Sequence, residues 1–154
     1  MGGNAALGNS IMAPEQYAAC VDISGGIGLT PHTMTLKDEL NSGLFKDFPL
    51  YLSTFGPADT LEGSRHDLAV FAKRNLEHGK KIPEYHIICG SKEFIRERVE
   101  RDVRTLQEIG YHINYICAEG YDHNFDLWDE YLRITMEELL PLKRKPVYPV
   151  GSLG

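Results

Sequence analysis

Three short apolar segments, separated by helical patterns, are the feature that most constrains the fold of this chain. The segments span residues 17–23, 85–89 and 112–117. Helical periodicity extends over residues 5–12, 65–78, 93–109 and 125–139. Short continuous apolar runs are typical of strands that are buried on both faces, as in parallel sheets. The alternation therefore predicts an α/β fold in which helices flank a mostly parallel sheet.

A glycine follows each of these segments at or near its end. Ser24-Gly25-Gly26 closes the first segment, Gly90 the second and Gly120 the third. The carboxyl ends of parallel strands meet at one edge of a sheet, and ligands bind at that edge. We therefore expect the polar residues next to these glycines to converge on one edge.

The helix expected at residues 93–109 is strongly amphipathic. Its inward-facing side chains are expected to be Phe94, Val99, Val103 and Leu106. Gly110 follows directly and is a natural C-cap, because glycine adopts the left-handed conformation that commonly ends a helix.

The rest of the chain shows less regular patterning. Residues 27–59 are punctuated by Gly and Pro, with short helical pieces near 36–40 and 44–48. A connection of this length is often a lid or a binding loop. We expect one partial domain over residues 1–142 and an irregular tail over 143–154.

Composition and charge exclude several classes of partner. The 154 residues carry a formal net charge of −6, which disfavours nucleic acid and anionic membranes as partners. No run approaches the roughly 20 apolar residues that a membrane span needs. The N-terminus lacks the basic and apolar regions of a signal peptide.

The three cysteines indicate a reducing compartment. Cys20, Cys89 and Cys117 each lie in or beside an apolar strand-like segment. An odd number of cysteines in buried contexts predicts reduced thiols and a cytoplasmic protein. Cys20 is expected to be a core residue rather than a nucleophile.

His123 is the strongest candidate for a catalytic side chain. It follows the glycine that ends the third strand and precedes an aromatic helix. A base on such a loop can reach a nucleophile on a neighbouring strand, and imidazole titrates near neutral pH. The alternative is a structural histidine that caps the start of this helix, next to Asp122.

Glu93 is the candidate partner of His123, because it lies three residues after Gly90 at the end of the second strand. A carboxylate there can accept the Nδ1 proton of a histidine and fix its orientation. The alternative is a glutamate that interacts with the dipole of the following helix.

The first residues, Met1-Gly2-Gly3, are typical of the second half of a Gly-x-Ser-x-Gly turn. That turn carries the nucleophile of α/β-hydrolases, which place their triad in the chain order Ser, acid, His. Glu93 and His123 fit this order. The sequence therefore predicts two thirds of a triad, truncated just after the nucleophilic serine.

Other constellations are weaker. Asp122, His123 and Asp126 could supply carboxylate and imidazole ligands to a metal ion. However, no second histidine lies at metal-ligand spacing. The segment 24–28 lacks the Lys-Ser/Thr of a phosphate-binding P-loop. Ser10 lacks the second glycine of a Gly-x-Ser-x-Gly turn and is expected to lie on a helix. We therefore expect no metal and no cofactor.

Several of these motifs occur together in one order along the chain. They are Met1-Gly2-Gly3, Ser24-Gly25-Gly26, and the stretches at 63–68 (Gly-Ser-Arg-His-Asp-Leu), 89–94 (Cys-Gly-Ser-Lys-Glu-Phe) and 120–128 (Gly-Tyr-Asp-His-Asn-Phe-Asp-Leu-Trp). In this order the chain resembles the C-terminal half of esterase D-like α/β-hydrolases, a group that includes S-formylglutathione hydrolases, tributyrin esterases, and feruloyl and acetylxylan esterases. The likeness covers residues 1–142.

The resemblance implies a role for three residues. His123 matches the catalytic histidine of the family, and Glu93 matches its catalytic acid, which is usually an aspartate. Met1 matches the residue after the nucleophile, whose backbone N–H is one donor of the oxyanion hole.

Two hypotheses of different class follow. In the first, the parent protein is a carboxylic ester hydrolase acting on a small-molecule ester, and this chain, without the nucleophile, is inactive alone. In the second, the chain is a non-catalytic α/β module that binds or oligomerises. In either case the first strand would keep an unpaired edge. We therefore expect a homo-oligomer or association with the missing N-terminal half.

Overall fold

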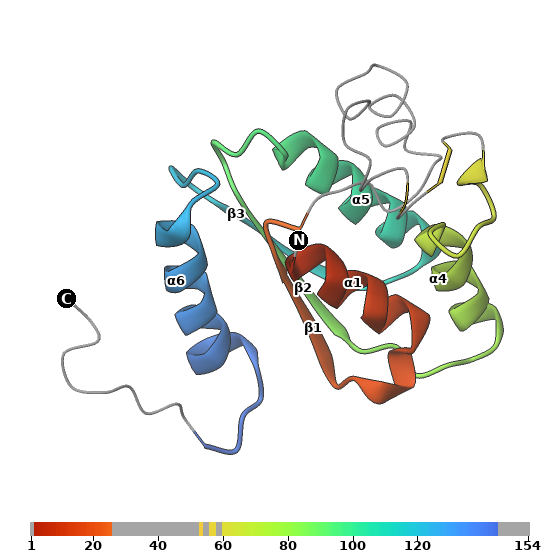
Figure 1. Cartoon of the computed structure of the whole chain (residues 1–154). Coiled ribbons are helices and arrows are strands. Elements are labelled where there is room, and N and C mark those ends of the chain that lie inside the picture. The colour runs from red at the N-terminus through yellow and green to blue at the C-terminus, as the bar shows by residue number, and fades with distance from the viewer. Residues whose placement is uncertain (1, 26–52, 54–55, 58–59, 145–154) are drawn as a thin grey trace.

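A computed structural model of the chain describes residues 2–25, 53, 56–57 and 60–144 (Figure 1). Met1, the predicted helical pieces near 36–40 and 44–48, and most of the predicted tail lie outside the described residues. The proposed domain boundary after residue 142 therefore stays a prediction.

Three parallel strands form the sheet. They are β1 (Ala19–Ile23), β2 (Glu84–Gly90) and β3 (Ile113–Ala118), in the spatial order β1-β2-β3. Ala19 pairs with Glu84, and Tyr85 pairs with Ile113. The predicted parallel α/β architecture is therefore confirmed, with each strand within two residues of its expected bounds.

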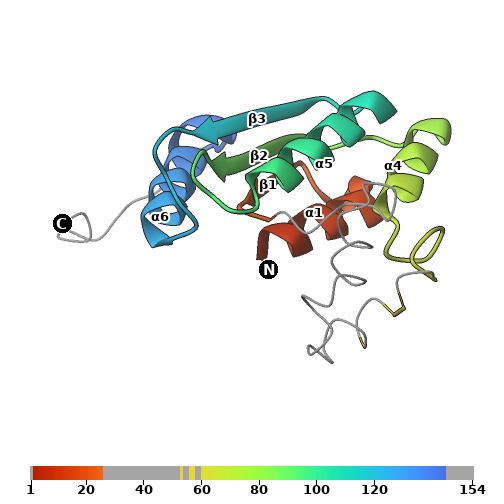
Figure 2. The same cartoon turned by 90° about the horizontal axis from the view of Figure 1, so that it is seen from above.

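Helices cover the two faces of the sheet unequally. The first face carries α1 (Gly2–Met12), α4 (Leu68–Glu77) and α5 (Arg96–Ile109), whereas α6 (Phe125–Ile134) lies on the other side (Figures 1 and 2). Short helical turns at Pro14–Gln16 and Thr135–Leu139 follow α1 and α6. The loop between β3 and α6 therefore leads from the carboxyl edge of the sheet to the other side, whereas the loop between β2 and α5 leads to the first face.

The main core lies between the sheet and the helices of the first face. Its buried members include Leu7, Ile11, Tyr85, Ile87, Val99, Val103 and Leu106. Alternate residues of β2 point into this cluster, while Ile88 is buried on the opposite face. As predicted, Gly110 ends α5 with a φ of 114°, and its N–H bonds to the Leu106 carbonyl.

Two expectations about burial are wrong. The helical pattern predicts Phe94 in the core, but this side chain is 74% exposed, because α5 begins at Arg96 and residues 91–95 form turns instead. The helical period therefore does not extend to position 94. Cys117 is exposed, whereas Cys20 and Cys89 are buried as expected; all three are free thiols.

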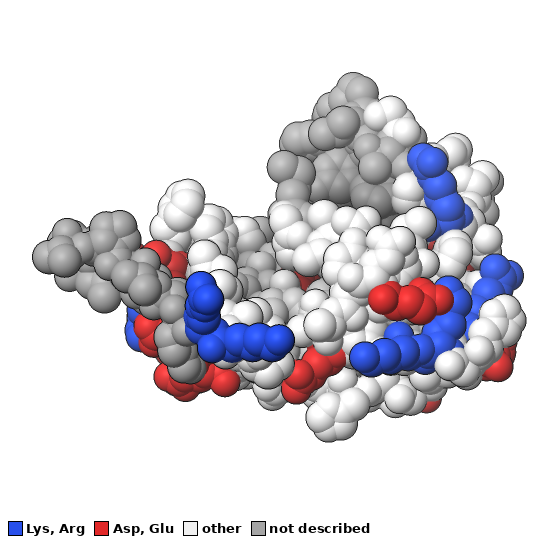
Figure 3. All heavy atoms as spheres, turned by 90° about the horizontal axis from the view of Figure 1, so that it is seen from below, with Lys and Arg blue, Asp and Glu red and all other residues white. Residues whose placement is uncertain are grey.

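The surface of the described residues carries both signs of charge. On the face drawn in Figure 3, acidic and basic side chains lie next to one another rather than in one continuous basic area. None of the helices in the described part of the chain is long and apolar enough to cross a membrane.

Gly90, the last residue of β2, packs directly against the loop that leads to His123. A β-carbon at Gly90 would collide with the backbone carbonyl of Tyr121 and lie 3.2 Å from Cγ of Glu93. The same Tyr121 carbonyl accepts a 2.9 Å hydrogen bond from the N–H of Lys92. Only glycine at this strand end lets the two loops approach so closely.

We predict that Gly90→Ala destabilises the protein by about 1–3 kcal/mol, the usual cost of forcing extra volume into a packed site. The measurement is the free energy of unfolding from urea titration. Gly2→Ala is the matched control, since a β-carbon at Gly2 meets nothing within 4 Å. It should be neutral or stabilising by up to about 1 kcal/mol. Equal effects of the two substitutions would contradict this account of Gly90.

Candidate active site

Glu93 and His123 meet at the carboxyl edge of the sheet. Oε2 of Glu93 lies 2.6 Å from Nδ1 of His123, although 30 residues separate them in the chain. The Glu93 side chain is fully buried, and that of His123 is 32% exposed. The predicted spatial convergence is therefore observed, whereas the catalytic roles of the two residues stay predictions.

The turn after β2 places the carboxylate of Glu93. The Glu93 N–H bonds to the Gly90 carbonyl, and Oε1 of Glu93 accepts the Gly90 N–H at 2.8 Å. A second donor, the hydroxyl of Ser24, reaches the same oxygen at 2.7 Å. A buried carboxylate needs such partners, because an unpaired buried charge is costly. With Oε1 satisfied by these two donors, Oε2 is directed to His123.

His123 lies on the loop between β3 and α6. Its N–H donates to Oδ1 of Asp122 at 2.7 Å, and α6 begins after Asn124, whose side chain accepts the Leu127 N–H. Asn124 is thus the N-cap, so the alternative of a histidine that caps the helix is wrong. Because the Glu93 carboxylate engages Nδ1, Nε2 is the ring nitrogen that can act as a base.

Two aromatic side chains flank the imidazole. The ring centroids of Phe94 and Trp128 each lie 5.2 Å from that of His123, at interplanar angles of 62° and 85°. Edge-to-face contacts of this kind are favourable and restrict ring orientation. Phe94, misassigned to the core from sequence, therefore packs against the histidine instead.

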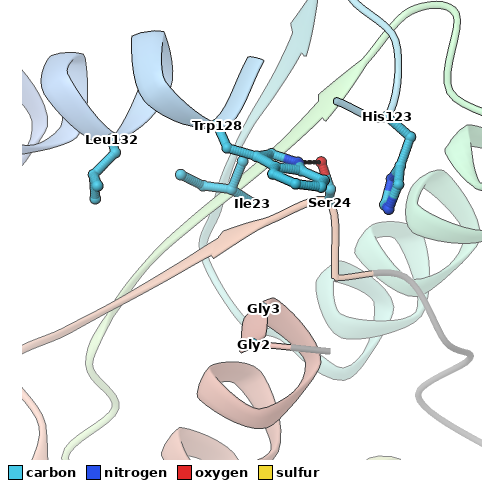
Figure 4. A pocket seen from close by; sticks show the side chains of 7 residues that line it. All are labelled: Gly2, Gly3, Ile23, Ser24, His123, Trp128 and Leu132. Carbon is cyan, nitrogen blue, oxygen red and sulfur yellow. Dashed lines mark hydrogen bonds between the residues drawn. The ribbon is translucent and has the colours of Figure 1, made fainter. Parts of the chain in front are cut away.

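A pocket opens beside the imidazole, with a volume of about 340 Å³. It is lined by Gly2, Gly3, Ile23, Ser24, His123, Trp128 and Leu132 (Figure 4). This volume is at the lower end of the range for small-molecule sites. The N-terminal turn of α1 and the end of β1 thus face the histidine across one cavity.

Sequence reasoning missed two residues of this site. The sequence pattern indicates Ser24 only as part of a strand-end turn, and Trp128 only as part of an aromatic helix. The Nε1–H of Trp128 donates to Oγ of Ser24 at 3.0 Å, and Ser24 in turn donates to Glu93. The position of Ser24 at the end of a parallel strand was the available signal.

The remaining sequence candidates lie either outside the described residues or away from the Glu93–His123 contact. Met1, the predicted oxyanion donor, lies outside the described residues, as does most of segment 24–28. Within the described residues, no three His, Cys, Asp or Glu side chains form a possible metal-binding group, so Asp122, His123 and Asp126 do not assemble as one. Ser10 lies on α1, and its hydroxyl donates to the Leu7 carbonyl.

Asp22 is a buried acidic side chain next to the site. Only 2% of it is exposed, and burial raises the pKa of its carboxyl group to about 7. A hydrogen bond from the Gly25 backbone partly opposes this shift, while the negative charge of Glu93 adds to it. Among the described residues, Oδ1 of Asp22 has no hydrogen-bond partner and lies against Gly3 and Gly25. These two positions therefore exclude any side chain.

Comparison with solved structures places this geometry in a known fold. The chain is similar to S-formylglutathione hydrolase FrmB from Staphylococcus aureus, with 17% identity, a TM-score of 0.63, and coverage of 86% of this chain and 48% of that chain. It is also similar to the serine hydrolase FphF from Staphylococcus aureus, with 19% identity, a TM-score of 0.62, and coverage of 85% and 48%. A ferulic acid esterase gives 16% identity, a TM-score of 0.55, and coverage of 86% and 45%.

These likenesses show the fold. The chain has an α/β-hydrolase fold and spans about half the length of the solved structures that it matches. The expected similarity to esterase D-like α/β-hydrolases is confirmed at the level of structure. No protein-family model matches the sequence. No curated protein matches it either.

Asp22 should make stability depend on pH. In the folded chain the carboxyl group has a pKa of about 7, against an ordinary value of 3.8, so the folded state binds the proton more tightly. The stability that the protonated Asp22 carboxyl group contributes is fully present below about pH 4. It is lost as the pH rises through about 7, because the folded chain must then hold a buried negative charge. We predict that Asp22→Asn stabilises the protein at pH 8 by about 2–4 kcal/mol relative to the native chain.

The measurement is urea unfolding of both chains between pH 4 and pH 8. The two stability curves should diverge as pH rises. Asp129→Asn is the control, because Asp129 is exposed on α6, and it should leave the curve unchanged. A constant offset between Asp22→Asn and the native chain across this range would contradict the prediction.

Proposed function

We propose that Glu93 and His123 are the acid and base of a serine-type carboxylic ester hydrolase. The nucleophile would come from polypeptide outside these 154 residues. The observation that carries the proposal is the 2.6 Å contact between a fully buried carboxylate and Nδ1 of a histidine that lines a pocket. An acid–histidine pair in this arrangement is the orienting half of a catalytic triad.

The proposed chemistry is acyl transfer. Nε2 of His123 removes the proton of a serine hydroxyl as the oxygen attacks the ester carbonyl, and it then gives that proton to the leaving alcohol. Glu93 holds the imidazole in the correct tautomer and stabilises the imidazolium that forms. Water then hydrolyses the acyl-enzyme, with His123 again acting as the base. The N-terminal end of α1 supports stabilisation of the oxyanion, since a helix N-terminus favours negative charge.

The pocket favours a small ester. Ile23, Trp128 and Leu132 give it an apolar lining that suits a short acyl or alcohol group. The net charge of −6 supports a small-molecule substrate rather than nucleic acid or an anionic membrane. The buried free thiols of Cys20 and Cys89 support a cytoplasmic setting.

The test begins with the coding sequence upstream of Met1. If it encodes a Gly-x-Ser turn in frame, the extended polypeptide should hydrolyse p-nitrophenyl acetate or butyrate. His123→Ala should lower its kcat by about a million-fold, because triad members act as a unit. Glu93→Gln should lower kcat by about ten-thousand-fold, since it permits the wrong tautomer.

The same hydrolysis assay is applied to the isolated 154-residue chain. Alone, it should release p-nitrophenol no faster than its own His123→Ala variant. His123-dependent hydrolysis by the isolated chain would place the nucleophile within it and contradict the proposal. An extended polypeptide that folds but lacks activity would favour the alternative, a non-catalytic α/β binding or oligomerisation module.

The proposal includes a partner for β1. In the described part of the sheet, β1 pairs only with β2, so no described strand occupies its other edge. Such an edge is a template for pairing with another strand. We propose that the chain associates through this edge, with the polypeptide that carries the nucleophile or, in its absence, with a second copy.

Light scattering of the isolated chain should therefore give a mass above that of the 17.3 kDa monomer. Val21→Lys, on β1, should shift the distribution toward monomer, because lysine on an edge strand opposes pairing. Val70→Lys on α4 is the matched control and should leave the mass unchanged. A native chain that is monomeric at tens of micromolar would rule out association through this edge.

A further inference from the structure

Ser24 combines an unusual backbone conformation with a buried hydroxyl. Among the described residues with a positive φ, Ser24 is the one that is not a glycine; its φ is 56°. Only 6% of the residue is exposed. A side chain in this conformation costs roughly 1–2 kcal/mol, so other contacts must hold it. Its N–H continues the sheet by bonding to the Ile88 carbonyl at 2.9 Å. Non-glycine residues held in this way cluster at functional sites.

The hydroxyl of Ser24 connects two residues that contact His123. A hydroxyl has one proton to donate, and that proton goes to Oε1 of Glu93 at 2.7 Å. Its oxygen accepts the Nε1–H of Trp128 at 3.0 Å, which fixes the rotation of the hydroxyl. Figure 4 shows Ser24 between the indole of Trp128 and the imidazole of His123.

We propose that Ser24, held by Trp128, is the positioning residue that fixes the carboxylate of Glu93, and through it the tautomer of His123. The importance of this positioning role for catalysis rests on the proposed function. Ser24 and Gly90 both donate to Oε1, so the carboxylate cannot rotate without losing two hydrogen bonds. Oε2 is therefore kept for the Nδ1 proton of His123.

The geometry distinguishes this role from that of a nucleophile. Activation of a serine requires its proton to be directed at the base. The proton of Ser24 is directed at the carboxylate instead, on the oxygen that does not contact His123. The oxygen of Ser24 accepts the indole N–H of Trp128. Ser24 thus orients the acid of the pair.

The experiment is ¹⁵N and ¹H NMR of His123 in the 154-residue chain, which needs neither nucleophile nor substrate. The native chain should show the Nδ1–H tautomer and a downfield, slowly exchanging Nδ1 proton. Ser24→Gly removes the hydroxyl and suits the positive φ. It should raise the exchange rate of that proton with water about tenfold, the size expected for one hydrogen bond to a charged group, and populate the Nε2–H tautomer.

Trp128→Phe provides a second route that keeps an aromatic ring beside His123. It should shift the exchange rate and the tautomer ratio in the same direction by a smaller factor. Ser64→Gly is the matched control, because the Ser64 hydroxyl accepts the His66 N–H away from this pocket. It should leave both readouts unchanged.

The proposal is overturned if Ser24→Gly folds and leaves the tautomer and the exchange rate of His123 as in the native chain. If Ser24→Gly does not fold, an unchanged spectrum of Trp128→Phe overturns it. Covalent labelling of Ser24 by a fluorophosphonate probe would also overturn it, by making Ser24 a nucleophile. Because the spectrum is recorded without turnover, an inactive extended polypeptide would reject the proposed hydrolase function and leave this result standing.

Discussion

The hydrogen bonding of one buried carboxylate organises the carboxyl edge of the sheet. Glu93 has no exposed side-chain surface, so its charge must be satisfied by protein donors. Those donors come from the end of β1, the end of β2 and the loop after β3. A single side chain therefore ties together three chain segments that the topology brings to the same edge.

The surrounding packing is built to permit this arrangement. Gly90 leaves room for the loop that carries His123 to approach β2, and Gly25 leaves room for the buried Asp22. Phe94 and Trp128 both make edge-to-face contacts with the imidazole. Hydrogen bonds thus hold Glu93 against His123, and the imidazole lines an open pocket. Under the proposed function, this is the preorganisation that acyl transfer requires.

Much of this could be predicted from sequence, for reasons that particular residues make clear. The parallel strands and their helices could be predicted from the hydrophobic periodicity of the sequence and from the glycines that follow the strands. Gly110 correctly predicted the end of α5. Glu93 and His123 could be paired because residues after parallel strands share one edge. Phe94 was misplaced, because an apolar residue just before a helix fits the helical period while lying on a turn.

The contact between Ser24 and Trp128 could not be predicted from any periodicity of the sequence. They are 104 residues apart, and only the folded chain brings the indole to the hydroxyl. The same contact has an optical consequence, because Trp128 is the sole tryptophan of the sequence. Its indole lies edge-on to the imidazole of His123. Intrinsic fluorescence therefore comes from a single indole that contacts both Ser24 and His123, without any added label.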